Sequence, residues 1–207
     1  MTTTTRAPRR DATENRASLL AAARVELNRD PGASLDTIAA SAGLSRRAVY
    51  GHFASRDELL SELVTLGAQR IGSAVIAGLD DPDARLAIAR LGASLWAEVD
   101  SIRPMAQLAV RGPLAPTVAR VLAPLRQALV DTVARGQREG TLRQDMTARQ
   151  VARLIEGAAL AVLDDSTRTA FATREGARLV ILAGLSAAGL HWRSAGDIIE
   201  AHQELVS

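Results

Sequence analysis

Arginine, tyrosine and histidine side chains cluster between residues 46 and 52. Arg46 and Tyr50 stand four positions apart, Arg47 adjoins the first of them, and His52 follows closely. Positions i and i+4 share one face of a helix, so Arg46 and Tyr50 point the same way. A guanidinium group forks onto O6 and N7 of guanine or pairs with a phosphate, and tyrosine and histidine commonly donate to phosphates. On an ordinary solvated helix the same side chains would have no such role, and the surrounding elements decide between the two interpretations.

The residues around this cluster predict two short helices joined by a tight turn. Ser34 is a ready N-cap for the first helix, and Gly43 ends it because glycine adopts left-handed backbone at no steric cost. Ser45 caps the second helix, whose Val49 and Phe53 are spaced to point inward together. This order of elements is typical of a helix-turn-helix, in which the second helix lies in the major groove of DNA.

Six side chains of this unit are candidates for DNA contact: Thr37, Ser45, Arg46, Arg47, Tyr50 and His52. We assign the two arginines to base readout, and the tyrosine and histidine to phosphates. Thr37 and Ser45 either reach phosphates or serve only as capping and helix-surface groups.

The bulk composition favours an all-α fold. Of the 207 residues 47% are hydrophobic but only 2% are aromatic, so the core consists mainly of Ala, Leu, Val and Ile. Ala, Leu and Arg favour helices, and no run alternates with the period of two that marks a strand. All 25 basic residues are arginine, and the formal net charge of +2 barely favours nucleic acid. DNA binding must therefore depend on where individual side chains lie.

Breaks in the helical pattern divide the chain into three parts. Residues 1–10 are rich in Thr, Arg and Pro and are expected to form a disordered N-terminal arm, which either reaches DNA phosphates or frays in solvent. Residues 11–54 form the helix-turn-helix domain, and residues 55–207 form a larger helical body. A long helix from Ser55 to about Leu79 begins in the head and continues into the body, so we expect it to connect them.

We expect about nine to ten helices in all. The seventh spans about residues 116–138 and contains Pro124, which should kink it or mark a restart. Apolar residues at helical spacing predict an eighth helix that begins at Thr147. A ninth helix spans about residues 173–193, and a short terminal helix starts near Asp197.

The head also carries a family signature, because apolar, turn and polar positions agree together in order. The matching residues are Ile38-Ala39, Ala42-Gly43-Leu44-Ser45, Tyr50, His52-Phe53 and Ser55-Arg56-Asp57-Glu58-Leu59. They resemble the head of the TetR (tetracycline-repressor) family of bacterial transcriptional regulators, over roughly residues 13–62. The resemblance implies a three-helix head and a helical body that binds a ligand and dimerises. It also implies phosphate contacts by Tyr50, His52 and Arg56, where Arg56 replaces the usual lysine with a planar cation.

The resemblance places a ligand cavity among the fourth to eighth helices of the body. The following apolar side chains either line that cavity or belong to the plain core: Trp96, Val99, Met105, Leu108, Leu122, Leu125 and Leu129. The scarcity of aromatic residues disfavours a stacking cage for a planar cation and favours an apolar or amphipathic effector. Possible polar anchors for it are Glu98, Arg103, Gln107 and Arg126.

The last two long helices are unusually rich in small residues, which allow close helix packing. Within one chain these helices could be core alone. The resemblance places the homodimer interface there, in the region of Val151, Ile155, Ala158, Leu182, Leu185 and Gly189. A dimer would present two recognition helices roughly 34–36 Å apart to a near-palindromic double-stranded DNA operator.

Enzyme chemistry finds little support in the sequence. There is no cysteine, no Gly-rich phosphate loop and no HExxH spacing, and the three histidines are scattered, so we expect no catalytic residues, metal site or cofactor. The longest apolar run, residues 179–190, is shorter than the ~20 residues of a membrane span, and no signal peptide is evident, which favours a cytoplasmic protein without membrane contact. The predicted function is a repressor released by a small effector. A helix-turn-helix protein controlled by a protein partner, an architectural DNA-binding factor and, remotely, a helical enzyme remain as alternatives.

Overall fold

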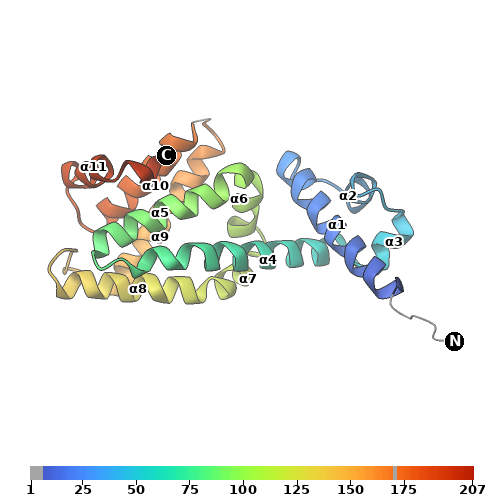
Figure 1. Cartoon of the computed structure of the whole chain (residues 1–207), viewed down its shortest axis with the longest axis horizontal. Helices are drawn as coiled ribbons and strands as arrows, with labels where there is room; N and C mark the ends of the chain where they lie inside the picture. The colour runs from blue at the N-terminus through green and yellow to red at the C-terminus, as the bar shows by residue number, and fades with distance from the viewer. Residues whose placement is uncertain (1–6, 170–171) are drawn as a thin grey trace.

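The computed structural model describes residues 7–169 and 172–207, which form α-helices and short 3-10 turns without a strand (Figure 1). The helices of the N-terminal part are α1 (Ala7–Arg29), α2 (Leu35–Ser41), α3 (Arg46–Tyr50) and α4 (Arg56–Ile76). Those of the body are α5 (Ala84–Val99), α6 (Arg103–Arg111), α7 (Ala115–Val121), α8 (Ala123–Arg138), α9 (Ala148–Ser166), α10 (Thr173–Ala187) and α11 (Trp192–Ala201). The 3-10 turns are Ala77–Asp80, Asp100–Ile102 and Gln203–Val206. The expected all-α class is confirmed.

The helix-turn-helix forms for the local reasons read from the sequence. The Ser34 side chain accepts the Thr37 N–H at 3.1 Å, and the Ser45 side chain accepts the Ala48 N–H at 3.2 Å. Gly43 adopts a φ of +67° in the turn between the two helices. The core side chains of the head are fully buried and come from α1, α2, α3, α4 and the loop between α3 and α4: Leu19, Leu27, Ile38, Val49, Phe53 and Leu59.

Helix α4 connects the head to the body. Figure 1 shows it running from beneath α1 along the whole body beside α8. Leu59 and Leu63 pack into the head core, whereas Val75 packs into the body core. By length and composition alone, the segment Arg56–Asp80 would be able to cross a membrane. In this fold many of its apolar side chains lie in the two cores or on the wall of a cavity described below, whereas Leu66 and Ile76 are exposed.

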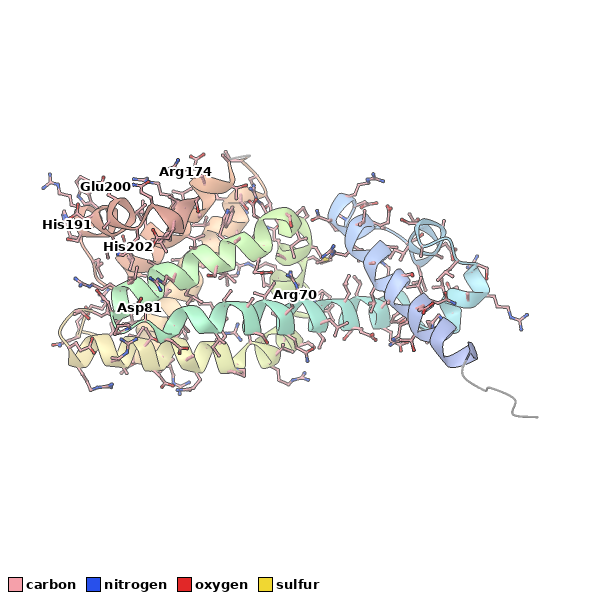
Figure 2. The ribbon with its side chains drawn as sticks, viewed as in Figure 1. Arg70, Asp81, Arg174, His191, Glu200 and His202 are labelled. Carbon is pink, nitrogen blue, oxygen red and sulfur yellow. The ribbon has the colours of Figure 1, made fainter. Side chains whose placement is uncertain are left out.

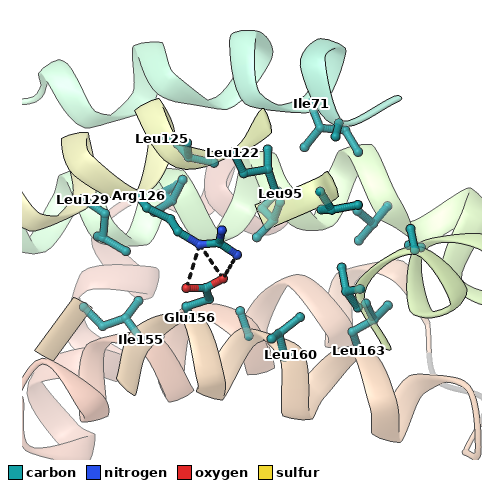
Figure 3. A pocket seen from close by; sticks show the side chains of 18 of the residues that line it. Ile71, Leu95, Leu122, Leu125, Arg126, Leu129, Ile155, Glu156, Leu160 and Leu163 are labelled. Atoms are coloured by element: carbon teal, nitrogen blue, oxygen red, sulfur yellow. Dashed lines mark hydrogen bonds and ion pairs between the residues drawn. The ribbon is translucent and has the colours of Figure 1, made fainter. Parts of the chain in front are cut away.

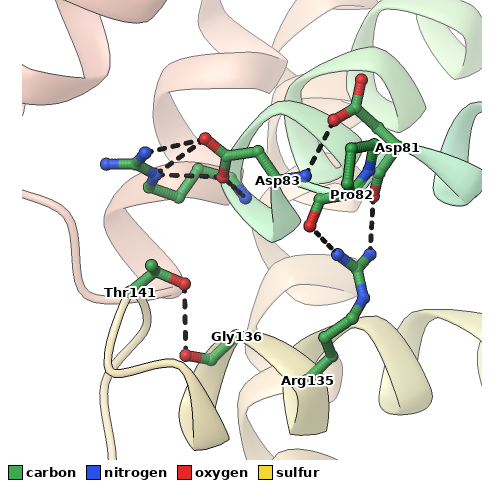
Figure 4. Close-up of polar contacts among 7 residues, drawn as sticks. Asp81, Pro82, Asp83, Arg135, Gly136 and Thr141 are labelled. Carbon is green, nitrogen blue, oxygen red and sulfur yellow. Dashed lines mark hydrogen bonds and ion pairs between the residues drawn. The ribbon is translucent and has the colours of Figure 1, made fainter.

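The corner between α4 and α5 is held by side chains (Figure 4). Arg135 of α8 donates Nη2 to the Asp81 carbonyl at 2.8 Å and also binds the Pro82 carbonyl. Asp83 caps α5 by accepting the Arg85 N–H at 2.9 Å. The Arg85 guanidinium hydrogen-bonds the same carboxylate and lowers the pKa of Asp83. These contacts fix the angle at which α5 returns along α4.

Two boundaries differ from the sequence-based expectation. Helix α1 begins at Ala7, inside the predicted disordered arm of residues 1–10, and the first six residues of that arm lie outside the described part. The predicted helix 116–138 is two helices, because α7 ends at Val121 and α8 restarts with Pro124 in its first turn. Proline is favoured there because its missing N–H has no helical partner to lose. The split adds one helix to the expected number.

A third difference lies at the end of α10, which stops well short of the predicted boundary at residue 193. Gly189 adopts a φ of +100°, which ends the helix after Ala187. A Cβ at position 189 would lie 2.6 Å from Cβ of Arg143, so the close approach of another loop also requires glycine. The terminal helix therefore starts at Trp192, five residues before the predicted Asp197.

Candidate DNA-binding face and ligand cavity

The outer side of the head presents the polar residues that the sequence singled out. Thr37, Ser45 and Arg47 are exposed, and Tyr50 is 46% exposed, whereas Val49 on the opposite face is fully buried. The Arg47 side chain makes no hydrogen bond or ion pair with any other described residue. Its guanidinium group is therefore free to bind a base or a phosphate.

Arg46 is already engaged. Its Nε lies 3.3 Å from a carboxylate oxygen of Asp36 in α2, and its guanidinium carbon lies 5.7 Å from the centroid of the Tyr50 ring. Both partners of the ion pair are well exposed, so the pair is weak and can exchange for a stronger anion. The sequence did not reveal this contact, because the two residues belong to different helices.

Arg56 and His52 have contacts inside the head. Arg56 donates Nε to the Ala33 carbonyl at 2.8 Å and Nη2 to the Pro31 carbonyl, which ties the start of α4 to the turn between α1 and α2. His52 is half-buried, and its backbone carbonyl accepts Nη1 of Arg16 at 2.8 Å. A phosphate contact by Arg56 would thus use the donors that the two carbonyls leave free.

Arg16 is a structural residue that the sequence did not single out. It forms a two-pronged ion pair with Glu62 of α4, and its guanidinium carbon lies 4.3 Å from the centroid of the Phe53 ring. Together with the bond to the His52 carbonyl, these contacts hold α1, the end of the helix-turn-helix and α4 together. No local spacing signals such a contact, because its partners lie 36 and 46 residues away.

A cavity of about 460 Å³ lies in the body among α4, α5, α6, α7, α8, α9 and α10. Such a volume falls in the usual range of small-molecule sites, about 300–1,000 Å³. Its lining is largely apolar, and Figure 3 shows Ile71, Leu95, Leu122, Leu125 and Leu129 on one side of it, with Ile155, Leu160 and Leu163 opposite. Of the seven apolar side chains expected on its wall, six line it, namely Trp96, Val99, Met105, Leu122, Leu125 and Leu129. The seventh, Leu108, lies outside the lining.

The polar groups on the cavity wall are Arg126, Arg149, Arg153 and Glu156. Arg126 of α8 donates Nε to Glu156 of α9 at 2.9 Å, as the dashed lines in Figure 3 show. The other three expected anchors lie outside the lining and have partners elsewhere: Glu98 with Arg70, Arg103 with Asp100, and Gln107 with Asp164. Arg126 is therefore the only one of the four expected anchors on the wall.

The proposed dimer residues divide between the core and the surface. Val151, Ile155 and Leu185 are at most 5% exposed and pack in the body's own core, so they have no surface for a second chain. This corrects their assignment to the interface. Ala158 and Leu182 are half-buried, and Gly189 is exposed where α10 ends.

Histidines and carboxylates form no cluster of three or more that could hold a metal among the described residues. Figure 2 shows His191 and His202 at the end of the body remote from the head. His191 accepts the Arg193 N–H as the cap of α11, and His202 pairs with Glu204. Both therefore have structural partners.

Comparison with known proteins finds one matching family model and several solved structures with a similar fold. Residues 19–63 match the model described as "Bacterial regulatory proteins, tetR family". The fatty acid degradation regulator FadR from Bacillus halodurans is 17% identical with a TM-score of 0.72, over 84% of this chain and 95% of that one. SmeT, the repressor of the Stenotrophomonas maltophilia multidrug efflux pump SmeDEF, is 21% identical with a TM-score of 0.65, over 83% and 89%. At these identities the likeness to solved structures shows a shared fold. No curated protein matches the sequence.

Proposed function

We propose that this chain, a DNA-binding transcriptional regulator of the TetR family and not an enzyme, is a cytoplasmic dimeric repressor. A small apolar or amphipathic effector releases it from a near-palindromic operator. One observation carries the effector part of the proposal. Leu63, Ile102 and Met105 line the cavity and also pack in or against the head core. A molecule that fills the cavity must press on the same side chains that set the position of the head. The shared wall favours this reading over control by a protein partner alone.

The DNA contacts follow from exposure and pairing in the free head. We assign Arg47 and Arg46 to base readout, and Tyr50, His52, Thr37 and Ser45 to phosphates or to positioning the helix. Arg47 needs no rearrangement, whereas Arg46 must leave Asp36. Arg56 supports the head in addition to any phosphate contact, because two backbone carbonyls depend on it.

These roles are separable by experiment. Arg47→Ala should leave the melting temperature unchanged and weaken operator binding, with a loss of roughly 1–3 kcal/mol that is concentrated on particular base pairs. Arg56→Ala should lower the melting temperature and weaken binding to all sequences alike, because it releases the Pro31 and Ala33 carbonyls. Fluorescence anisotropy on operator and random duplexes over a range of salt, together with thermal melting, measures both. Equal losses for Arg47→Ala on the two duplexes would count against base readout.

The dimer interface that we propose is the outward face of α9 and α10. Leu154 is 44% exposed there, Gly157 and Ala161 follow it at helical spacing, and Leu182 and Ser186 continue the face on α10. Small side chains on α9 allow close approach of a second copy, and a two-fold axis would bring the same face to itself. This face replaces the buried residues Val151, Ile155 and Leu185 in the interface.

Release from DNA requires that the effector prefer the DNA-incompetent arrangement, since equal affinity for both states shifts nothing. α6 is the element best placed to transmit the change: Met105 lies between the cavity and the head, and the Ser101 carbonyl just before α6 accepts the Asn28 side chain of α1 at 2.8 Å. α4 contributes through Leu63. Effector entry should therefore move α4 and α6 together with the head.

Met105→Ala tests this coupling. Because Met105 also lines the cavity, the variant should lose some affinity for an effector found by thermal-shift screening. The effector concentration that releases operator DNA should nevertheless rise by much more than this loss of affinity explains, because the contact with the head is lost. Leu129→Ala, on the cavity wall away from the head core, is the matched control and should weaken effector binding itself. A Met105→Ala protein that releases DNA at the parent's effector concentration would contradict the role of α6.

A further inference from the structure

The cavity changes character along α9. Arg149, Arg153 and Glu156 succeed one another at helical spacing on the wall, and Leu160 and Leu163 continue the same face toward the end of the helix. Figure 3 shows Glu156, with Arg126 opposite it on α8, to one side of Leu160 and Leu163. The cavity thus has a charged end near the start of α9 and an apolar end near α6.

Positive charge is in excess at the charged end. Arg126 and Glu156 neutralise each other, and Arg126 also donates Nη1 to the Ala119 carbonyl at 2.7 Å. Arg149 and Arg153 are exposed, and their side chains have no hydrogen-bond or ion-pair partner elsewhere in residues 7–169 and 172–207. Two unpaired guanidinium groups thus stand beside the Arg126–Glu156 pair at the charged end of the cavity, one helical turn apart.

We propose that the effector is an anionic amphiphile, whose negatively charged head binds Arg149 and Arg153 and whose apolar tail lies along Leu160 and Leu163 toward Met105. This rests on the proposed function and names the chemical class of its effector. Guanidinium groups bind carboxylates and other oxyanions through paired hydrogen bonds, which are strengthened by charge. The tail in this orientation reaches the residue that the cavity shares with the head core.

A cationic amphiphile fits the same lining poorly. The carboxylate that would receive it, Glu156, already accepts Nε and Nη2 of Arg126, so a cation would have to displace that guanidinium. It would also approach the positive charges of Arg149 and Arg153. An anion meets two free donors and breaks no existing pair.

Three probes with the same tail isolate the head group: decanoate, decanol and decylammonium. Isothermal titration with the full-length protein should give the tightest binding for decanoate, weaker for decanol and weakest for decylammonium, and added salt should weaken decanoate alone. The double variant Arg149→Gln/Arg153→Gln should lose decanoate affinity by about tenfold or more and change decanol affinity little. Arg138→Gln, which removes an exposed arginine of α8 that is not on the cavity wall, should behave like the parent.

The charge-reversal variant Arg149→Glu/Arg153→Glu should bind decylammonium more tightly than decanoate. Neither arginine holds another described residue, so both double variants should keep the parent melting temperature. The proposal is overturned if the parent prefers decylammonium, binds none of the three probes, or keeps its decanoate affinity in the glutamine variant.

Operator release in a gel-shift assay separates this inference from the proposed function. Decanoate that binds through the two arginines but leaves DNA bound supports the anion site and refutes its role as the effector site. Decanol that releases DNA equally from the parent and the glutamine variant supports effector control and overturns the anionic head.

Discussion

Replacing Gly176 with alanine should destabilise the body through a single steric conflict. A Cβ at this position of α10 would lie 2.0 Å from Cζ2 and 2.2 Å from Cε2 of Trp96 on α5. Ordinary carbon–carbon contacts lie at about 3.5–4.0 Å, so the two helices or the indole ring must separate by roughly 1.5 Å. Trp96 is 1% exposed and is enclosed by the rest of the core, so the ring has no open space to enter except the cavity that it lines.

The magnitude follows from two opposing effects. Overpacking a well-packed core costs about 1–3 kcal/mol, and the rigid, buried indole ring places this case at about 3. Alanine in a helix gains about 1 kcal/mol over glycine. The net loss of about 2 kcal/mol lowers the melting temperature by about 4–8 °C for a chain of this length. A matched control is Gly196→Ala in α11, where a Cβ would meet nothing within 4 Å and only the gain remains.

Thermal melting of five proteins tests the reasoning: the parent, Gly176→Ala, Gly196→Ala, Trp96→Phe, and Gly176→Ala combined with Trp96→Phe. The smaller phenyl ring should relieve the clash, so the double variant should show a coupling free energy of about 1 kcal/mol or more relative to the two single changes. A Gly176→Ala protein that melts at or above the parent temperature, as Gly196→Ala should, would refute the steric account. A coupling close to zero would show that Trp96 is not the group displaced.

Three further outcomes are expected. Asp36→Asn should tighten operator binding by up to about fivefold in anisotropy titrations, because Arg46 no longer has to leave an exposed ion pair worth about 0.2–1 kcal/mol. Weaker operator binding would contradict this. The Arg111 guanidinium lowers the pKa of Asp164 below its ordinary 3.8. This carboxylate therefore stabilises the fold above pH 3.8 and loses its effect as the pH falls through the lowered pKa. Asp164→Asn should melt slightly lower than the parent at neutral pH, and the difference should vanish in acid. Leu182→Arg places a charge on the proposed interface and should give monomers that no longer bind the operator. A dimer that stays intact by light scattering would contradict the proposed interface.

Local signals explain what could be predicted from the sequence. The helix-turn-helix depends on two serine caps and on the positive φ of Gly43, and each of these is decided within a few residues. The inward direction of Val49 and Phe53 follows from helical spacing in the same way. The helices of the head, and the side of α3 that points inward, could therefore be predicted from the sequence.

Side-chain contacts between residues far apart in the sequence could not be predicted. The sequence around Arg46 does not indicate whether this side chain is free or paired with Asp36. In the same way, the sequence around Arg56 does not indicate whether its side chain faces DNA or the Pro31 carbonyl. The cavity presents the same difficulty, since helical spacing does not tell Leu108, outside the lining, from Met105 on the wall. Which side of α6 faces inward is decided by the helices that pack against it.

Helix α9 shows why the interface residues were misassigned and where the correct signal lies. A helix packed on one side needs a single apolar stripe, yet α9 is apolar around most of its circumference. Ile155 faces the body core, Leu160 faces the cavity, and Leu154 with Ala161 faces outward. The body covers only the first two faces. The third face, on which Leu154 is 44% exposed, is apolar surface that a second copy of the chain would bury. The sequence indicated that α9 has more apolar surface than one core needs. Only the packing of α10 and the position of the cavity showed which residues form the outward face.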